Sequence, residues 1–279
     1  MKRLVNALPD TNLQERRTPR KADVRGEYYR DTTAIIHSSA FRRLKHKTQV
    51  FFSPSNDHIC TRMEHVLHVA SIASAICRGL GLDNELAWAI GMGHDLGHTP
   101  FGHVGERILA GFMEADGAGH FEHEVNSLRV VDFLADKGRG LNLTYAVRDG
   151  IVTHCGESFI QSLRPQAVIK DFSGITTRNG LVPSTWEAAV VRFSDSIAYL
   201  GRDFEDAVRL SIVTKDMLPE RVVRILGNTN GHIIDTLVTN IIETSDDVQG
   251  ISFSDEVFSA VEEMKAFNYE YIYKSPELN

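Results

Sequence analysis

The chain has 279 residues, 42% of them hydrophobic, and a formal net charge of −7, so it can bury a substantial core in one large domain or two small ones. No apolar run approaches the roughly 20 residues of a membrane-spanning helix, so we expect no such helix. The start, Met1-Lys2-Arg3-Leu4, lacks the apolar stretch of a signal peptide, and we expect a cytoplasmic protein without a membrane partner.

Basic residues gather at the N-terminal end. Residues 1–48 hold twelve Lys or Arg against five Asp or Glu. Residues 1–30 are polar and predict an extended arm that is ordered only by packing or by a partner subunit. Four cations follow, and they belong either to a solvated arm or to a surface that faces a polyanion such as a triphosphate or a nucleic-acid strand: Arg42, Arg43, Lys45 and Lys47.

Alternating signals in the next segment predict a short helix, a strand and then a longer helix. The helix covers about 32–45, and the β-branched and aromatic run at 48–52 predicts one short strand. Thr61-Arg62-Met63-Glu64 is a capping box that begins the longer helix, and Gly79 or Gly81 ends it.

Two further helix starts follow. Asp83 can cap a helix through Met92, and Thr99-Pro100 can begin another that runs to about Met113, with Pro at its first position. A second capping box at Ser184-Thr185-Trp186-Glu187 would open the longest helix. The other amphipathic segments cover roughly 121–135, 142–155, 185–213, 219–228, 231–243 and 254–272. We therefore expect an all-α fold with at most a minor short strand or hairpin near the N-terminus.

The three cysteines do not form a recognisable site. Cys60, Cys77 and Cys155 are odd in number and contain no Cys-x-x-Cys pair. This argues against a disulfide framework and against a thiolate zinc site. We expect each to be a small buried or half-buried residue rather than a nucleophile.

The most informative motif is the run 90–106. His94 is followed directly by Asp95, and three more ionisable residues come within eleven positions: His98, His103 and Glu106. Neighbouring residues on a helix point about 100° apart, so His94 and Asp95 can reach one ion only near a helix end. The flanking glycines suit such an end. Alone, however, a His-Asp dipeptide could equally be a hydrogen-bonded pair.

A catalytic divalent ion would need two further ligands. Our candidates are His65, early in its helix, and Asp195, which follows an apolar run and would otherwise be a buried unpaired carboxylate. Mixed imidazole and carboxylate ligands favour Mn, Fe, Mg, Co or Ni over a structural zinc. The remaining histidines considered are assigned to the surface or the core: His58, His68, His120, His154 and His232.

Taken together, these motifs resemble the HD-domain superfamily, and in particular the bacterial deoxyguanosine triphosphate triphosphohydrolase-like (dNTPase) family. The resemblance runs over nearly the whole chain. It rests on Ile36–Leu44, Lys47–Phe51, Thr61–His65, the His-Asp run and Arg192–Tyr199. The chain ends at Asn279, and we expect it to be shorter than many relatives.

The resemblance implies an HD helical fold and a set of site residues. It implies metal ligands at His65, His94, Asp95 and Asp195 for one divalent ion, with Mn and Mg first among the candidates. It also implies a catalytic pair, His103 and Glu106, with His98 and His123 along the phosphate path. The implied substrate contacts are Arg62, Gln49, Tyr199 and Asp203, to which Arg43 of the basic segment is added.

Spacing supports part of this set independently. Asp195, Tyr199 and Asp203 follow at i, i+4 and i+8 and so share one helix face. The alternative for Tyr199 is a core aromatic with a wet hydroxyl. For Asp203 it is a surface charge near Arg202.

The expected organisation is a single HD-type dNTPase domain over 1–279. Residues 1–60 would form the arm and substrate-facing segment, 61–207 the metal-binding core, and 208–279 the C-terminal helices. The expected reaction is hydrolysis of a deoxynucleoside triphosphate to deoxynucleoside and inorganic triphosphate. Alternatives are another HD phosphohydrolase (a nucleoside monophosphatase or cyclic-nucleotide phosphodiesterase) or a nucleotide-sensing protein with little catalysis that binds single-stranded DNA. The family also implies a homo-oligomer.

Overall fold

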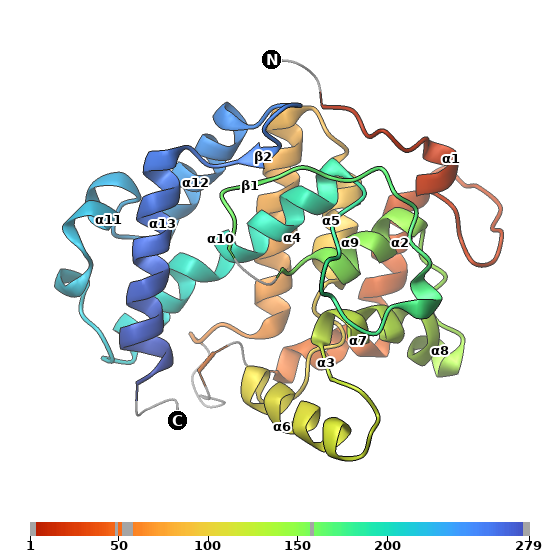
Figure 1. Cartoon of the computed structure of the whole chain (residues 1–279), viewed down its shortest axis with the longest axis horizontal. Helices are drawn as coiled ribbons and strands as arrows, with labels where there is room; N and C mark the ends of the chain where they lie inside the picture. Colours follow the sequence, from red (N-terminus) through yellow and green to blue (C-terminus); the bar gives the residue numbers. More distant parts are fainter. Residues whose placement is uncertain (1–3, 48–49, 52–57, 157–158, 276–279) are drawn as a thin grey trace.

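Three helices form the centre of the computed structural model, which describes residues 4–47, 50–51, 58–156 and 159–275. They are α4 (Arg62–Leu80), α5 (Asn84–Gly93) and α10 (Trp186–Arg209), and each packs on the other two (Figure 1). A Cβ on Gly91 would lie 2.7 Å from Cα of Ala70, so the backbones of α4 and α5 approach as closely as only glycine allows.

The remaining helices cover this centre. Helices α2 (Glu27–Ile36) and α9 (Tyr145–Thr153) pack on α5, and α12 (Asn230–Thr244) packs on α4 and α10. Around them lie α1 (Asp10–Leu13), α3 (Ser39–Arg43), α6 (Gly102–Ala115), α7 (His123–Arg129), α8 (Ala135–Gly138), α11 (Glu220–Ile225) and α13 (Asp255–Asn268). The all-α prediction is confirmed.

The two strands that the described residues form are far from the N-terminus. β1 (Ser162–Leu163) pairs antiparallel with β2 (Ile251–Ser252), with Ser162 opposite Ser252. The strand expected at 48–52 falls mostly outside the described residues, and its two described members, Val50 and Phe51, are not in a strand. In the described part of the chain, every helix is too short or too polar to cross a membrane.

Side-chain caps fix most of the expected helix starts. Thr61 and Glu64 form the predicted capping box of α4, and the Asp83 carboxylate accepts from two backbone N–H groups at the start of α5. The second capping box is wrong. Thr185, not Ser184, caps α10, and Glu187 accepts instead from Asn6 Nδ2 at 2.8 Å and from the backbone N of Asp83 at 3.1 Å.

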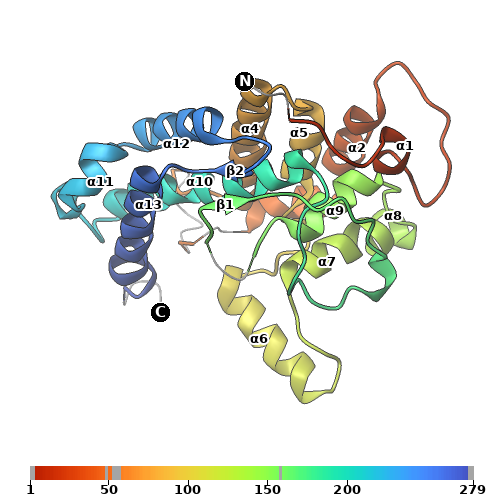
Figure 2. The same ribbon diagram turned by 45° about the horizontal axis from the view of Figure 1, so that its top comes forward.

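Helix α6 begins later than predicted. Phe101 has a left-handed backbone (φ 66°), so the helix starts at Gly102 and Pro100 is not at its first position. The helix projects from the body of the molecule (Figure 2). Its outer side chains Ile108 and Phe112 are 57% and 71% exposed. This part of the molecule therefore buries little apolar surface.

The N-terminal segment is ordered by its own chain. Leu4 and Leu13 are buried, and Arg16 forms ion pairs with Glu27 at 2.7 Å and Asp31 at 2.5 Å. The helix expected over 32–45 is broken, because Ser38 has extended backbone and caps α3. Of the two ways in which the segment was expected to become ordered, packing within the chain is the one that the structure shows for these residues.

Candidate metal centre and active site

His65 and Asp195 meet between α4 and α10. The capping box places His65 in the first turn of α4, where its ring is buried. Asp195 comes from the middle of α10, and its Oδ1 lies 2.9 Å from His65 Nε2. Burial disfavours the Asp195 carboxylate, but the surrounding imidazoles outweigh that cost and hold its pKa well below the usual range.

His94 and Asp95 lie at the end of α5, as the spacing argument requires. Nδ1 of His94 donates to the carbonyl of Gly91 at 2.7 Å, which leaves the lone pair on Nε2. That Nε2 is buried, and no described residue gives it a hydrogen bond. It lies 3.8 Å from both Asp95 Oδ2 and Asp195 Oδ1. Burial lowers the pKa of His94 to about 4, so the ring is neutral near pH 7.

These four side chains fit a divalent cation. An unprotonated, buried imidazole nitrogen without a hydrogen bond is costly unless an electron-pair acceptor lies against it. His65, His94 and Asp195 offer ligand atoms within 4.8 Å of one another, and Asp95 adjoins them. Two imidazoles and two carboxylates form the donor set expected for Mn, Mg, Fe, Co or Ni.

Arg62 has a role that the sequence did not indicate. Its Nη1 is paired with Oδ2 of Asp95, and both side chains are buried. Burial opposes ionisation of Asp95, yet the guanidinium and nearby histidines hold its pKa well below the usual value. Arg62 therefore orients a candidate ligand while it also lines the cavity described below.

His98, His123 and Glu106 form the opposite side of the site. The rings of His98 and His123 stack with centroids 4.5 Å apart. Glu106 Oε1 accepts from the backbone N of His123 and lies 2.9 Å from its Nδ1. Although burial opposes protonation, Glu106 and nearby carboxylates raise the pKa of His123. The side chain of His103 lies outside the described residues, so its pairing with Glu106 stays a prediction.

A cavity of about 940 Å³ opens onto these side chains, except that of His94, which is buried next to Asp95. Tyr199 and Asp203 line it from the same face of α10 as Asp195. The surface alternative for Asp203 is wrong, because this side chain is 2% exposed and accepts from the Tyr273 hydroxyl at 2.6 Å. Burial raises the pKa of Asp203 to about 7.

Two expected substrate contacts are not brought to this cavity by the described structure. Gln49 lies outside the described residues. Arg43 is exposed, and it is not one of the described residues that line the cavity. Its assignment as a substrate contact therefore has no support from the geometry.

Sequence reasoning missed several lining residues. Lys265 and Tyr273 come from α13 and the turn after it, and Lys265 Nζ donates to the Tyr199 hydroxyl at 3.0 Å. His154, assigned above to the surface or core, is buried beside His94 with ring centroids 4.8 Å apart. Cys155 adjoins it and is half-buried. The sequence held one signal for these residues: His154 follows the C-terminal end of a helix, as His94 does, and could have been considered as a site residue for that reason.

Comparisons with known proteins agree with this geometry. The family model of the HD domain matches residues 62–199. The chain is 42% identical over 257 residues to a deoxyguanosinetriphosphate triphosphohydrolase-like protein of Caldanaerobacter subterraneus subsp. tengcongensis, covering 92% of this chain and 68% of the relative. It is 41% identical over 275 residues to the protein of the same name in Desulfatibacillum aliphaticivorans, covering 97% and 73%.

Proposed function

Because the chain belongs to the deoxyguanosinetriphosphate triphosphohydrolase-like family of HD-domain phosphohydrolases, we propose that it hydrolyses deoxynucleoside triphosphates to deoxynucleosides and inorganic triphosphate. The observation that carries the proposal is the buried lone pair on His94 Nε2, which lies 3.8 Å from each of two carboxylates, Asp95 and Asp195, that line a large cavity. A site of this kind suits metal-assisted hydrolysis.

His65, His94, Asp95 and Asp195 would hold the metal, with Mn and Mg as the first candidates. When bound, the metal supplies positive charge that offsets the phosphate charge and makes water a better nucleophile. The chain itself keeps His94 neutral through burial and fixes its tautomer through Gly91. Arg62 holds Asp95 in place.

We assign proton transfer to the side of the site that contains Glu106 and His123. His103 and Glu106, three residues apart on α6, are the proposed catalytic pair, with His98 and His123 along the phosphate path. Glu106 also holds His123, whose raised pKa favours a protonated ring that can donate to a phosphate oxygen or the departing 5′-oxygen. Several cations line the same cavity and suit a triphosphate: Arg62, Arg107, Arg178, Arg192 and Lys265.

The sugar end of the substrate would lie against α10. Tyr199 and Asp203 are proposed to contact the deoxyribose and its 3′-hydroxyl, together with Gln49. Since burial raises the pKa of Asp203 to about 7, this carboxyl can offer either a donor or an acceptor to a hydroxyl near neutral pH. Equal hydrolysis of GTP and dGTP would contradict a closed sugar pocket.

We further propose that residues 1–279 act as a single HD-type unit that assembles into a homo-oligomer in the cytoplasm. Single-stranded DNA remains a proposed additional partner because of the basic residues in 1–48. Sedimentation velocity and salt-dependent strand binding test these two statements separately.

The central test is incubation of the Mn²⁺-loaded protein with each of the four dNTPs, followed by separation of all products. We expect deoxynucleoside and intact triphosphate. Release of monophosphate and pyrophosphate would contradict the proposal, as would turnover confined to nucleoside monophosphates or cyclic nucleotides. The same assay with His103→Ala tests the assigned catalytic pair, since turnover should collapse while nucleotide binding persists.

A further inference from the structure

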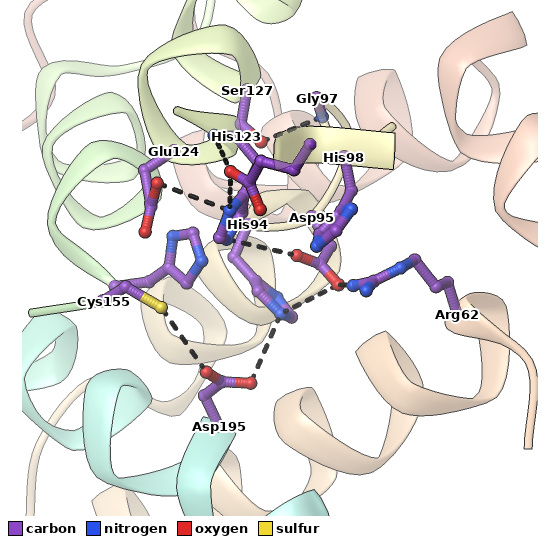
Figure 3. A network of polar contacts seen from close by, with 12 residues as sticks. Arg62, His94, Asp95, Gly97, His98, His123, Glu124, Ser127, Cys155 and Asp195 are labelled. Atoms are coloured by element: carbon purple, nitrogen blue, oxygen red, sulfur yellow. Dashed lines mark hydrogen bonds and ion pairs between the residues drawn. The ribbon is translucent and has the colours of Figure 1, made fainter. Parts of the chain in front are cut away.

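Four more metal-binding side chains lie beside the proposed centre but outside its ligand set. They are His123 and Glu124 at the start of α7, and His154 and Cys155 at the end of α9. One ligand atom from each lies within 4.8 Å of the other three. Figure 3 shows Glu124 and Cys155 on the left of His94, whereas Arg62 is on the right.

His154 offers one ring nitrogen to this cluster. Its Nδ1 donates to the carbonyl of Ile151 at 2.7 Å, so in the neutral ring Nε2 is unprotonated. The ring is buried, and its centroid lies 5.4 Å from that of His123. This is the same arrangement that prepares His94 as a ligand, repeated at the end of a second helix.

Glu124 supplies the second observation that indicates a ligand. Arg178 pairs with its Oε1, whereas Oε2 is buried and accepts no hydrogen bond from the described part of the chain. Its contact with His123 Nδ1 is long, at 3.5 Å. A buried carboxylate oxygen in this state costs free energy unless a cation lies against it.

Cys155 gives the cluster a different chemical character from the first centre. Its Sγ lies 3.8 Å from Asp195 Oδ2, within reach of a weak S–H hydrogen bond. Sulfur joined to imidazole selects thiophilic ions such as Zn²⁺, whereas the N/O set of the first centre does not. The other two cysteines, Cys60 and Cys77, are buried elsewhere.

We propose that His123, Glu124, His154 and Cys155 form a second metal site that binds a thiophilic divalent cation such as Zn²⁺. Ligand atoms around a tetrahedral zinc lie about 3.5 Å apart, so side-chain shifts of about 1 Å close the cluster. A metal–sulfur bond forms, and the thiol proton leaves to solvent. The thiolate and Glu124 then face the cation, and Arg178 keeps the Glu124 carboxylate oriented.

Occupation of this site has a consequence for catalysis that rests on the proposed function. An imidazole nitrogen that coordinates an ion cannot also carry a proton. Zn²⁺ at the cluster therefore makes one nitrogen of His123 unable to donate a proton, and the ring can no longer serve as a doubly protonated cation on the phosphate path. We expect Zn²⁺ to inhibit an enzyme that is already loaded with Mn²⁺.

Cobalt titration of the metal-free full chain tests binding without any assay of activity. Co²⁺ bound to a thiolate gives an intense sulfur-to-metal band in the near ultraviolet. We expect this band in the wild type and in the control Cys77→Ala, and its loss in Cys155→Ser. His65→Ala should weaken binding at the first centre and leave the band. A wild type without the band at saturating Co²⁺, or a Cys155→Ser variant that keeps it, overturns the proposal.

Inhibition provides a second readout. The ratio of dNTP hydrolysis rates with and without added Zn²⁺ is measured within each variant, at fixed Mn²⁺. We expect at least about 10-fold weaker inhibition in Cys155→Ser and in Glu124→Gln than in the wild type, in line with the loss of affinity when one group at a metal site is removed. Equal inhibition in all three proteins contradicts the assignment. If no dNTP is hydrolysed, the proposed function fails, and the cobalt experiment still decides the metal site.

Discussion

The cavity has two unlike walls. One is the packed wall formed by α4, α10 and the turn that follows α5, where His65 and Asp95 line the cavity and the adjacent His94 is buried. The other is α6, which projects from the body and leaves Ile108 and Phe112 in solvent (Figure 2). Both walls carry groups of the proposed site.

The difference indicates a division of work between the two walls. Metal ligands must keep their geometry to within a fraction of an ångström, and close packing provides that. The groups on α6 are proposed to act on protons, and their hydrogen bonds can tighten when substrate binds. Substitutions in the packed wall should therefore affect metal binding and stability, whereas substitutions of the proposed catalytic residues on α6 should lower turnover and leave the metal bound.

The largest expected effect is that of His94→Ala in the packed wall. Loss of the metal removes several kcal/mol of transition-state stabilisation, so dNTP hydrolysis should fall at least about 1000-fold. Bound manganese, measured by mass spectrometry after gel filtration, should fall in parallel. His232→Ala, on the exposed face of α12, is the control. If the variant keeps both its bound manganese and its turnover, His94 is not a metal ligand and the assignment of the metal site to the packed wall is wrong.

Glu106→Gln tests the α6 wall in the same two assays. General acid–base groups contribute about 100-fold or more, so turnover should fall by roughly that factor. Manganese content should stay at the wild-type level, because Glu106 is outside the proposed ligand set. Loss of metal together with activity would show that the two walls do not divide the work.

Glycine substitutions compare the packing of the walls directly. A Cβ on Gly97 would lie 2.1 Å from the backbone N of Ser127, on the turn that follows His94 and Asp95. Gly97→Ala should lower the free energy of unfolding by about 2–3 kcal/mol, because α7 must move away. The midpoint of urea unfolding measures this change. An unchanged midpoint would mean that α7 can move away from residue 97 at little cost in free energy.

Asp203→Asn gives a pH-dependent effect on stability. The folded pKa of Asp203 is about 7 against an ordinary 3.8, so the folded state binds its proton more tightly than the unfolded state does. This group's contribution to stability is therefore lost as the pH rises from about 4 to 7. The variant should gain on the order of 2 kcal/mol relative to the wild type near pH 8, and less near pH 5. A gain that is independent of pH would contradict the raised pKa.

The smallest effect is expected in α6. A Cβ on Gly111 would meet nothing within 4 Å, and the position is inside a helix. Gly111→Ala should therefore raise the free energy of unfolding by about 0.5–1 kcal/mol through the lower entropy of the unfolded chain. Thermal unfolding measures it. Destabilisation instead would show that α6 packs more closely than the exposed side chains indicate.

Most of the fold could be predicted because local signals act within one helix turn. The Thr61 capping box and the Asp83 cap fixed two helix starts, and apolar periodicity found the long helix α10. Errors arose where a distant residue competes. Glu187 was expected to cap its own helix, but Asn6 and Asp83 bind it, and their position is invisible from residues 184–187.

The site residues, too, could be predicted where a local motif marks them and were missed where packing between distant segments decides. His65, His94, Asp95 and Asp195 were expected from motifs, and the structure brings them together, although their role as ligands stays a prediction. The ion pair of Arg62 with Asp95 and the burial of Asp203 depend on packing between helices. Lys265 reaches the cavity from α13 and Tyr273 from the turn after it, and no short motif connects them to the cavity.

The anchoring of the N-terminal segment has a consequence for proteolysis. Residues 17–26 are all exposed, whereas Leu4, Leu13 and the Arg16 ion pairs fasten the preceding stretch to the body. A protease that cleaves within 17–26 would cut the chain without releasing the peptide. The cleaved molecule would then be a non-covalent complex, in which the N-terminal fragment stays bound to the rest of the protein.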